Sequence, residues 1–181
     1  MAIVRDYTRN KNGGFLIGTG GHGHDIWETL NHSIPTIYPW RWADHHTDWY
    51  PTGGGIIIGI NDPQLRFQVY EAMRLPVPDN TWIHPAALIQ DSTIIDAGTH
   101  INYGVTMTRT TIGHHTTISP GVTICGDVTI GDRVLIGAGS TICDRVTIGN
   151  DVTIGAGAVV LPETVIPDGE TWFGVPAKTK S

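Results

Sequence analysis

Two adjacent histidines, His114 and His115, are the clearest candidates for chemistry in this sequence. Histidine is the side chain whose ordinary pKa lies nearest neutral pH, so it exchanges protons readily and also binds metal ions. Either residue could serve as a general base in catalysis. The alternative is that both are solvated turn residues, and the local sequence IGHHTTISPG leaves both interpretations open.

Two cysteines, Cys125 and Cys143, form the second group with chemical capacity. A nucleophilic cysteine needs a neighbouring base or cation to form the thiolate, and the pattern places no histidine close to either one. We expect both to fill a slot that elsewhere holds glycine or alanine. Two cysteines indicate no disulfide framework, which is typical of a protein of the reducing cytoplasm.

The third group is a glycine-rich turn in the stretch GTGGHGHD, made of Gly18, Gly20, Gly21, His22 and Gly23. An apolar segment precedes this turn, and a helix is expected from about Asp25. A strand, a glycine turn and a helix N-terminus together suit a phosphate group. The spacing does not match the dinucleotide fingerprint, because Gly23 falls one residue early. A tight turn without a ligand is therefore the alternative.

The elements that must position these residues follow from a repeat of six. From Ile83 onwards an apolar residue recurs as Ile89, Ile95, Ile101 and Met107, and then as Ile112, Ile118, Ile124, Ile130, Ile136, Ile142, Ile148, Ile154, Val160 and Ile166. A period of six fits neither an α-helix nor an alternating strand. It fits short strands that meet at sharp corners, where glycine and asparagine tolerate positive φ.

We therefore predict a left-handed parallel β-helix of hexapeptide repeats over residues 81–166, with three strands in each coil. The step from Met107 to Ile112 is five residues, and it is the single irregularity in the repeat. The sequence PDGETWFGVPAK breaks the pattern after Ile166. Residues 167–181 are expected to cap the end of the column, where strand edges would otherwise be exposed.

Residues 13–80 have a different composition and predict a small Rossmann-like α/β domain, preceded by an extension over residues 1–12. Strands are expected at Phe15–Ile17, in IPTIYP and in GGGIIIGI. A helix is expected in NDPQLRFQVYEAMRLP, with Asp62 as its N-cap and Pro63 in its first turn. The segment WRWADHHTDWYPTGGG predicts a long loop.

Composition narrows the classes of partner. The chain has 181 residues and a net charge of −6, without a cluster of lysine or arginine, so nucleic acid is not an expected partner. No apolar run is long enough to cross a membrane, and the first residues lack the apolar core of a signal peptide. These features predict a cytoplasmic protein without a membrane partner.

A glycine-rich βαβ segment, a hexapeptide column and the ending GVPAK together resemble the sugar acyltransferases of the NeuD/PglD group. The resemblance implies transfer of an acetyl group from acetyl-CoA to a nucleotide-linked, amino-type sugar. It also implies a homotrimer, in which acetyl-CoA lies along the column between neighbouring subunits. The N-terminal domain is then expected to bind the nucleotide sugar, with the glycine turn from Gly18 to Gly23 as part of that site.

The same resemblance implies roles for individual residues of the column. Asn102 falls where the family has an asparagine near the active site. The backbone amide that stabilises the oxyanion falls on Gly126, and backbone contacts to the pantetheine arm fall on Ala138 and Ala156. No metal is expected.

One expected residue is missing from this pattern. The family's general base is a histidine in the hexad that here opens at Met107, yet that hexad is one residue short and carries Thr108 and Arg109. A second family histidine, near the thioester, falls on Thr117. Either His114 or His115 replaces the base, or the chain is a weak or inactive enzyme that binds nucleotide sugar or CoA, or a scaffold.

A zinc site is the remaining alternative, because columns of this shape bind zinc through three shared histidines in the γ-type carbonic anhydrases. His84, His100, His114 and His115 all lie in the column. His100 and His114 are expected on neighbouring coils of one face. Adjacent histidines, however, cannot easily both point outward, and the glycine domain has no part in that chemistry.

Overall fold

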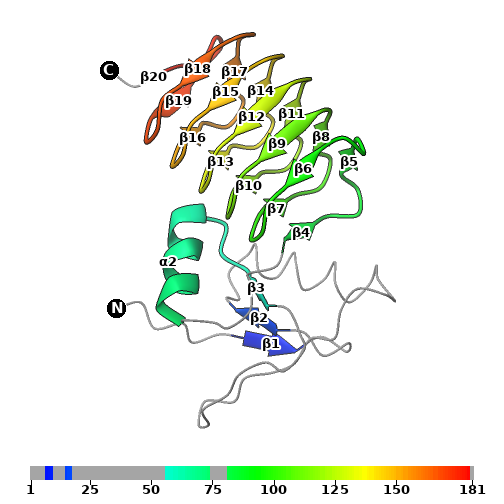
Figure 1. Ribbon diagram of the computed structural model, residues 1–181, viewed down its shortest axis with the longest axis vertical. Coiled ribbons are helices and arrows are strands. Elements are labelled where there is room, and N and C mark those ends of the chain that lie inside the picture. The colour runs from blue at the N-terminus through cyan, green and yellow to red at the C-terminus, as the bar shows by residue number, and fades with distance from the viewer. Residues whose placement is uncertain (1–6, 10–14, 18–55, 74–80, 180–181) are drawn as a thin grey trace.

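A computed structural model describes residues 7–9, 15–17, 56–73 and 81–179 of the chain. Residues 81–179 wind into a parallel β-solenoid of about five turns, and its flat coils stack along one axis above the N-terminal part of the molecule (Figure 1). Among the described residues, no helix is long and apolar enough to span a bilayer.

Three sheets form the faces of the solenoid, and all their strands pair in parallel except β20, which is antiparallel to β19. Face one contains β4 (Trp82–Ile83), β7 (His100–Ile101), β10 (Thr117–Ile118), β13 (Leu135–Ile136), β16 (Thr153–Ile154), β19 (Thr171–Phe173) and β20 (Lys178–Thr179). Face two contains β5 (Leu88–Ile89), β8 (Thr106–Met107), β11 (Thr123–Ile124), β14 (Thr141–Ile142) and β17 (Val159–Val160). Face three contains β6 (Ile94–Ile95), β9 (Thr110–Ile112), β12 (Val128–Ile130), β15 (Thr147–Ile148) and β18 (Val165–Ile166).

The corners of successive coils stack into three edges. The first edge joins faces one and two and consists of residues 84–87, 102–105, 119–122, 137–140 and 155–158. The second edge joins faces two and three and consists of residues 90–93, 108–109, 125–127, 143–146 and 161–164. The third edge returns to face one and consists of residues 96–99, 113–116, 131–134, 149–152 and 167–170.

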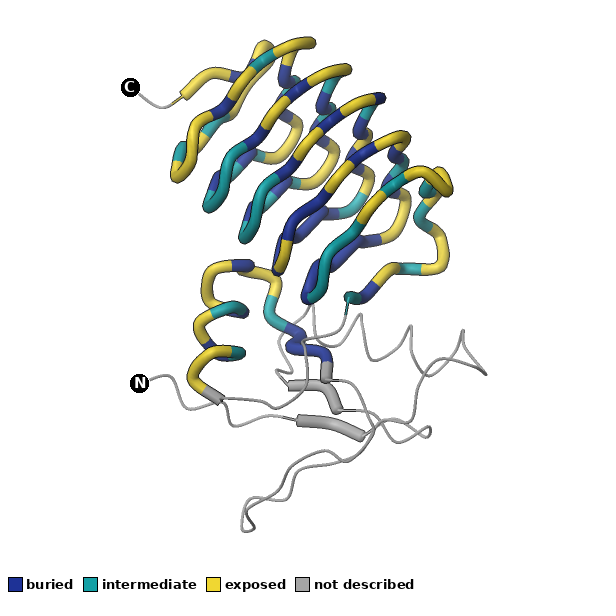
Figure 2. The backbone as a smooth tube through the Cα atoms, viewed as in Figure 1, coloured by how far each residue is buried: buried dark blue, intermediate teal, exposed yellow. Residues whose placement is uncertain are grey.

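The sixfold apolar residues point into the solenoid, as predicted. From Ile101 to Ile166 each of them is at most 2% exposed, and they form one continuous core (Figure 2). Burial of these aliphatic side chains is the main force that holds the coils together. The first coil differs, because Ile83 remains 39% exposed and Ile89 and Ile95 are only partly buried at the end of the stack.

The short step from Met107 to Ile112 leaves the stacking intact. Met107 still pairs with Ile124, and Ile112 pairs with both Ile95 and Ile130. The missing residue is therefore lost from the second edge, between β8 and β9. Arg109 takes the left-handed conformation there (φ 43°), which Asp127, Arg145 and Glu163 of that edge also adopt.

The third edge is tied together by polar side chains that cap the amides of the preceding coil. The N–H of His114 donates to Asp132 Oδ1 (2.8 Å), that of Asp132 to Asn150 Oδ1 (2.8 Å), and that of Asn150 to Asp168 Oδ1 (2.7 Å). A Cβ on Gly131 would lie 2.6 Å from Asn150 Oδ1. Glycine is required at this position because the acceptor of the next coil occupies the space.

The N-terminal sheet has the order β1–β2–β3, formed by Tyr7–Arg9, Phe15–Ile17 and Ile56–Ile58. The strands expected at Phe15–Ile17 and in GGGIIIGI are present, and they pair in parallel as a βαβ unit requires. Residues 7–9 differ from expectation, because they pair antiparallel with β2 and belong to the sheet instead of an extension. The strand expected in IPTIYP, the helix from Asp25 and the tryptophan-rich loop lie outside the described residues.

Helix α2 (Pro63–Met73) begins as predicted. The N–H of Leu65 donates to Asp62 Oδ1 (2.9 Å), so Asp62 is the N-cap, and Pro63 stands in the first turn. The helix packs against the third edge of the solenoid. Its Arg66 is fully buried there, and its Phe67 lies under the Arg133 guanidinium at 5.2 Å.

The residues after Ile166 cover the far end of the column. Strand β19 continues face one by pairing with β16, and β20 folds back antiparallel against β19. The N–H of Ala177 donates to the carbonyl of Val159 (2.7 Å), and Ala177 joins the core. The capping function predicted for this segment is consistent with these contacts.

Candidate functional site

The first edge holds three of the residues selected from the sequence. Asn102 is 4% exposed and donates from Nδ2 to the carbonyl of Ile118 (3.2 Å). Ala138 and Ala156 lie on the same edge two and three coils further along, and both are exposed. Backbone bonds between coils align this edge, as in the 2.9 Å bond from Gly157 N–H to the carbonyl of Ala138. The structure therefore brings Asn102, Ala138 and Ala156 onto one edge, with Asn102 one residue before the register of the two alanines.

The second edge holds Gly126, whose amide is already engaged. Its N–H donates to Asp144 Oδ1 (3.0 Å). Arg109, from the shortened corner, lies above it and makes a two-point ion pair with Asp127, at 2.9 Å from Nε and 3.3 Å from Nη2. A Cβ on Gly126 would lie 2.3 Å from Arg109 Nη2. An oxyanion could reach the Gly126 amide only if Asp144 moved away.

Arg109 and Asp127 at this edge stabilise each other's charged forms. The hydrogen bond from Arg109 lowers the pKa of Asp127, and the same bond raises the pKa of Arg109. Neither group therefore exchanges protons near neutral pH. The corner where the resemblance expects a general base contains no side chain able to act as one.

The third edge holds His114, which is exposed and lies between two carboxylates of neighbouring coils. Its Nδ1 is 3.6 Å from Asp96 Oδ2 and 3.5 Å from Asp132 Oδ1. Both separations are too long for hydrogen bonds, so the interaction is electrostatic. Because both carboxylates face Nδ1, they favour a ring orientation in which Nε2 points away from them. A histidine oriented by a carboxylate through one nitrogen has the other available as a base.

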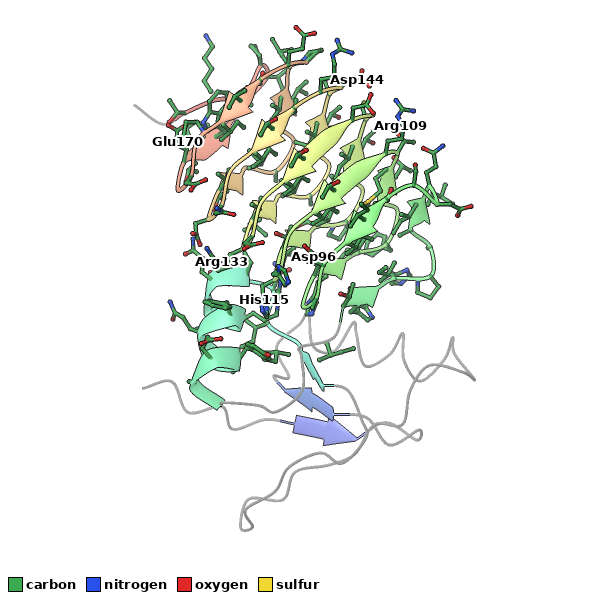
Figure 3. The ribbon with its side chains drawn as sticks, viewed as in Figure 1. Asp96, Arg109, His115, Arg133, Asp144 and Glu170 are labelled. Atoms are coloured by element: carbon green, nitrogen blue, oxygen red, sulfur yellow. The ribbon has the colours of Figure 1, made fainter. Side chains whose placement is uncertain are left out.

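His115, the neighbouring candidate, is a packing residue in this structure. It is 6% exposed and has φ 56°. Its ring lies 5.2 Å from the ring centroids of both Phe67 and Tyr70 on α2 (Figure 3 shows its place beside the helix). A Cβ on Gly98 would collide with its ring. These contacts favour His114 over His115 as the residue that meets a substrate.

Thr117, at the position of the second family histidine, contacts α2 instead of facing solvent. Arg66 Nη1 donates to Thr117 Oγ1 (2.9 Å), and Thr117 Oγ1 donates to the carbonyl of Asn61 (2.9 Å). Arg66 Nη2 also donates to the carbonyls of His115 and Thr116, the second at 3.1 Å. Arg66 thus fastens α2 to the strand that follows His114.

The cysteines have the features of structural residues. Cys125 and Cys143 are both free, and they occupy stacked corners of the second edge as expected. Partial burial raises the pKa of the Cys125 thiol, and the nearby Asp144 raises it further. A raised pKa disfavours the thiolate, so the structure gives no support to a nucleophilic cysteine.

The zinc alternative finds no support in the part of the chain that the structure describes, where no three His, Cys, Asp or Glu side chains are grouped to hold a metal. His100 is fully buried, while the His114 side chain is exposed, so the two do not face a common space.

The glycine turn with Gly18, Gly20, Gly21, His22 and Gly23 lies outside the described residues.

Sequence reasoning missed Asp96, Asp132 and Arg66. Asp96 and Asp132 occupy the third edge, one coil before and one coil after His114, and the shortened coil hides this spacing in a linear reading of the repeat. Arg66 carries no sequence signal, because a buried arginine on a short helix has the same pattern as an exposed one.

Comparisons with known proteins agree with this geometry. The family described as bacterial transferase hexapeptide (six repeats) matches residues 109–144 and 127–162, which lie inside the solenoid. A comparison with curated protein sequences gives no significant match.

Solved structures share the fold over nearly the whole chain. A perosamine N-acetyltransferase from Caulobacter crescentus, in complex with CoA and GDP-perosamine, is 24% identical, with a TM-score of 0.71 over 97% of this chain and 99% of that one. A second structure of that enzyme is 27% identical, with a TM-score of 0.58 over 70% of this chain and 69% of the other. The acetyltransferase domain of PglB from Neisseria gonorrhoeae is 24% identical, with a TM-score of 0.68 over 91% and 98%. The predicted resemblance to hexapeptide-repeat acyltransferases is confirmed.

Proposed function

We propose that the chain is an acetyl-CoA-dependent acyltransferase that acts on an amino sugar linked to a nucleotide. The observation that carries this proposal is that Asn102, Ala138 and Ala156 share one edge of a hexapeptide solenoid. An exposed edge of small residues admits an extended thioester arm against the backbone. The likeness to structures that contain CoA and GDP-perosamine supports this class of substrates.

The proposed reaction needs three contributions from the protein. A base removes the proton of the attacking amine, for which we assign His114 with its two flanking carboxylates. A backbone N–H stabilises the oxyanion, for which we assign Gly126 once Asp144 has released it. Alignment of both substrates lowers the barrier further, because it replaces a chance encounter by a fixed geometry.

These groups lie on three different edges of one chain, so a complete site requires more than one subunit. His114 is on the third edge, Gly126 on the second, and Ala138 and Ala156 on the first. In a cyclic homotrimer each cleft lies between two subunits, so a face of one subunit can bring its two edges to the cleft while the neighbour brings the third. The trimer that the resemblance implies would supply such clefts. The Rossmann-like domain over residues 13–80 would hold the nucleotide above them.

The experiment is a thiol-release assay of the full chain with acetyl-CoA and a panel of UDP-, GDP- and dTDP-linked amino sugars. Release of CoA that depends on one of these acceptors, with acetylated sugar identified by mass spectrometry, supports the proposal. Binding of CoA without turnover on any acceptor contradicts it.

A second candidate function is a binding module or scaffold without transferase activity. The observation in its favour is the second edge, where the Arg109–Asp127 ion pair occupies the corner of the missing base and Asp144 occupies the Gly126 amide. Calorimetric binding of CoA and a nucleotide sugar to a protein without turnover is the outcome that favours this candidate.

A further inference from the structure

An aromatic cluster lies at the start of the first edge, beside Asn102, and has no role in the function proposed above. Tyr103 projects from the corner after β7 with 56% of its surface exposed. Its ring stands at 67° to the ring of His84, with 5.9 Å between centroids. The His84 ring stands at 87° to that of Trp82, which is buried. The exposed ring is therefore supported from behind by two others.

The tautomer of His84 follows from its backbone contact. The N–H of Ala86 donates to His84 Nδ1 (3.0 Å), so Nδ1 is the acceptor of the neutral ring. The proton of neutral His84 is consequently on Nε2. His84 presents a hydrogen-bond donor next to Tyr103, and not a general base.

Tyr103 shares a register with the residues assigned to the thioester arm. Gly121 N–H donates to the carbonyl of Tyr103 (3.0 Å), and the corresponding bonds continue through Pro120 and Ala138 towards the coil of Ala156. In the coils after Tyr103, the same position of the first edge is occupied by Pro120, Ala138 and Ala156. Tyr103 is the single aromatic side chain in this register. A thioester arm that extends along Ala156 and Ala138 towards the N-terminal sheet would reach Tyr103.

We propose that Tyr103 and His84 form the subsite for the pyranose ring of the acyl acceptor. An aromatic face packs against the apolar C–H face of a sugar ring, while His84 Nε2–H and the tyrosine hydroxyl bind its oxygen substituents. The proposal rests on the proposed function, because the direction of the thioester arm determines which part of the substrate reaches Tyr103. It goes further by assigning sugar recognition to residues of the solenoid itself.

The test measures steady-state kinetics of the full chain with the amino sugar that gives the best turnover in the panel. Tyr103→Ala is expected to raise the KM for the nucleotide sugar roughly tenfold, the effect of losing one stacked ring, and to leave the KM for acetyl-CoA unchanged. Tyr103→Phe retains the ring and is expected to stay within about threefold of the parent. Leu161→Ala is the matched control, because it removes a half-exposed apolar side chain from the second edge.

Saturation-transfer NMR with the same nucleotide sugars supplies a readout that needs no turnover. Transfer from the protein to the sugar ring protons, reduced in Tyr103→Ala but not in Leu161→Ala, supports the subsite. Such saturation transfer without any turnover contradicts the proposed acyltransferase activity and supports the subsite. Four results overturn the subsite. Two are kinetic: turnover that Tyr103→Ala does not affect, or a raised KM for acetyl-CoA alone. Two come from NMR: saturation transfer confined to the protons of the nucleotide base, or no binding of any panel member.

Discussion

His114 is the residue on which the proposed chemistry depends most. The short hexad removes the histidine that the resemblance expects and leaves an arginine whose charge is fixed by Asp127. One corner further along, a different histidine stands between Asp96 and Asp132. A proton acceptor is thus retained in the coil, but on another edge.

His114→Ala is expected to lower kcat by roughly 10²–10⁴-fold, the usual contribution of a positioned general base, with little change in CoA binding. The measurement is the thiol-release rate together with calorimetric titration of CoA. Asp96→Asn combined with Asp132→Asn is expected to give a smaller loss, since the base remains but loses its orientation. Full activity of His114→Ala in a folded protein contradicts the assignment.

The ion pair of Asp151 with Arg133 predicts how the stability of the protein depends on pH. Arg133 binds it through two points, at 2.7 and 2.9 Å, and this hydrogen bonding lowers the pKa of Asp151 below its ordinary value of 3.8. A carboxyl group with a lowered folded-state pKa binds more protons when unfolded, so its stabilisation is present above pH 4 and is lost as the pH falls through its folded-state pKa.

The melting temperature of Asp151→Asn is therefore expected to lie below that of the parent at pH 7. The two are expected to converge below the folded-state pKa of Asp151. Thermal denaturation from pH 7 to pH 2 measures this, with Asp91→Asn as the control because that aspartate is an exposed corner residue of the first coil. Parallel curves for parent and Asp151→Asn contradict the prediction.

At the scale of elements, the corners determine how tightly the coils stack. The ladder of Asp132, Asn150 and Asp168 fits only because Gly113, Gly131 and Gly149 leave space for it. Arg66 anchors α2 by donating to backbone carbonyls of that same third edge. Stacking and docking therefore use the same edge, and His114 lies between them in the chain.

Gly131→Ala is expected to destabilise the protein by roughly 1–3 kcal/mol, because its Cβ would meet backbone atoms at 2.8 Å as well as Asn150 Oδ1. Gly139→Ala is the comparison, since that glycine has φ 67° and nothing within 4 Å of an added Cβ. Its cost is conformational only, about 1 kcal/mol. Urea denaturation distinguishes the two, and equal losses contradict the steric explanation.

At the scale of the whole molecule, the separation of the site residues on three edges is the main constraint. A single solenoid cannot turn all three of its edges towards one ligand. Acyl transfer by this chain therefore requires an assembly in which edges of neighbouring subunits meet. On face three, the threonines Thr111, Thr129 and Thr147 lie in register on successive coils and give this face a row of polar side chains.

Subunit mixing tests this requirement. His114→Ala removes the base, and Ala138→Trp fills the first edge, so each variant alone is expected to be inactive. Refolding the two together at equal amounts is expected to restore about a quarter of the parental activity, because a random trimer contains that share of interfaces with both native residues. Light scattering provides the mass of the assembly. No recovery from mixed trimers of the correct mass argues against a shared site.

The solenoid could be predicted because its signal is local and repeated. Each apolar residue at the sixth position has to be buried, and each corner needs glycine, asparagine or aspartate, so the sequence alone determines three faces, an inner core and a cap. The N-cap of α2 follows from Asp62 and Pro63 in the same local way.

Only the tertiary structure decided which residues meet. The proximity of Asp96 and Asp132 to His114 depends on how a shortened coil stacks on its neighbours, and the burial of His115 depends on where α2 docks. Arg66 reaches the third edge across about fifty residues of chain. These contacts join segments remote in sequence, and their energies depend on packing that no local pattern records.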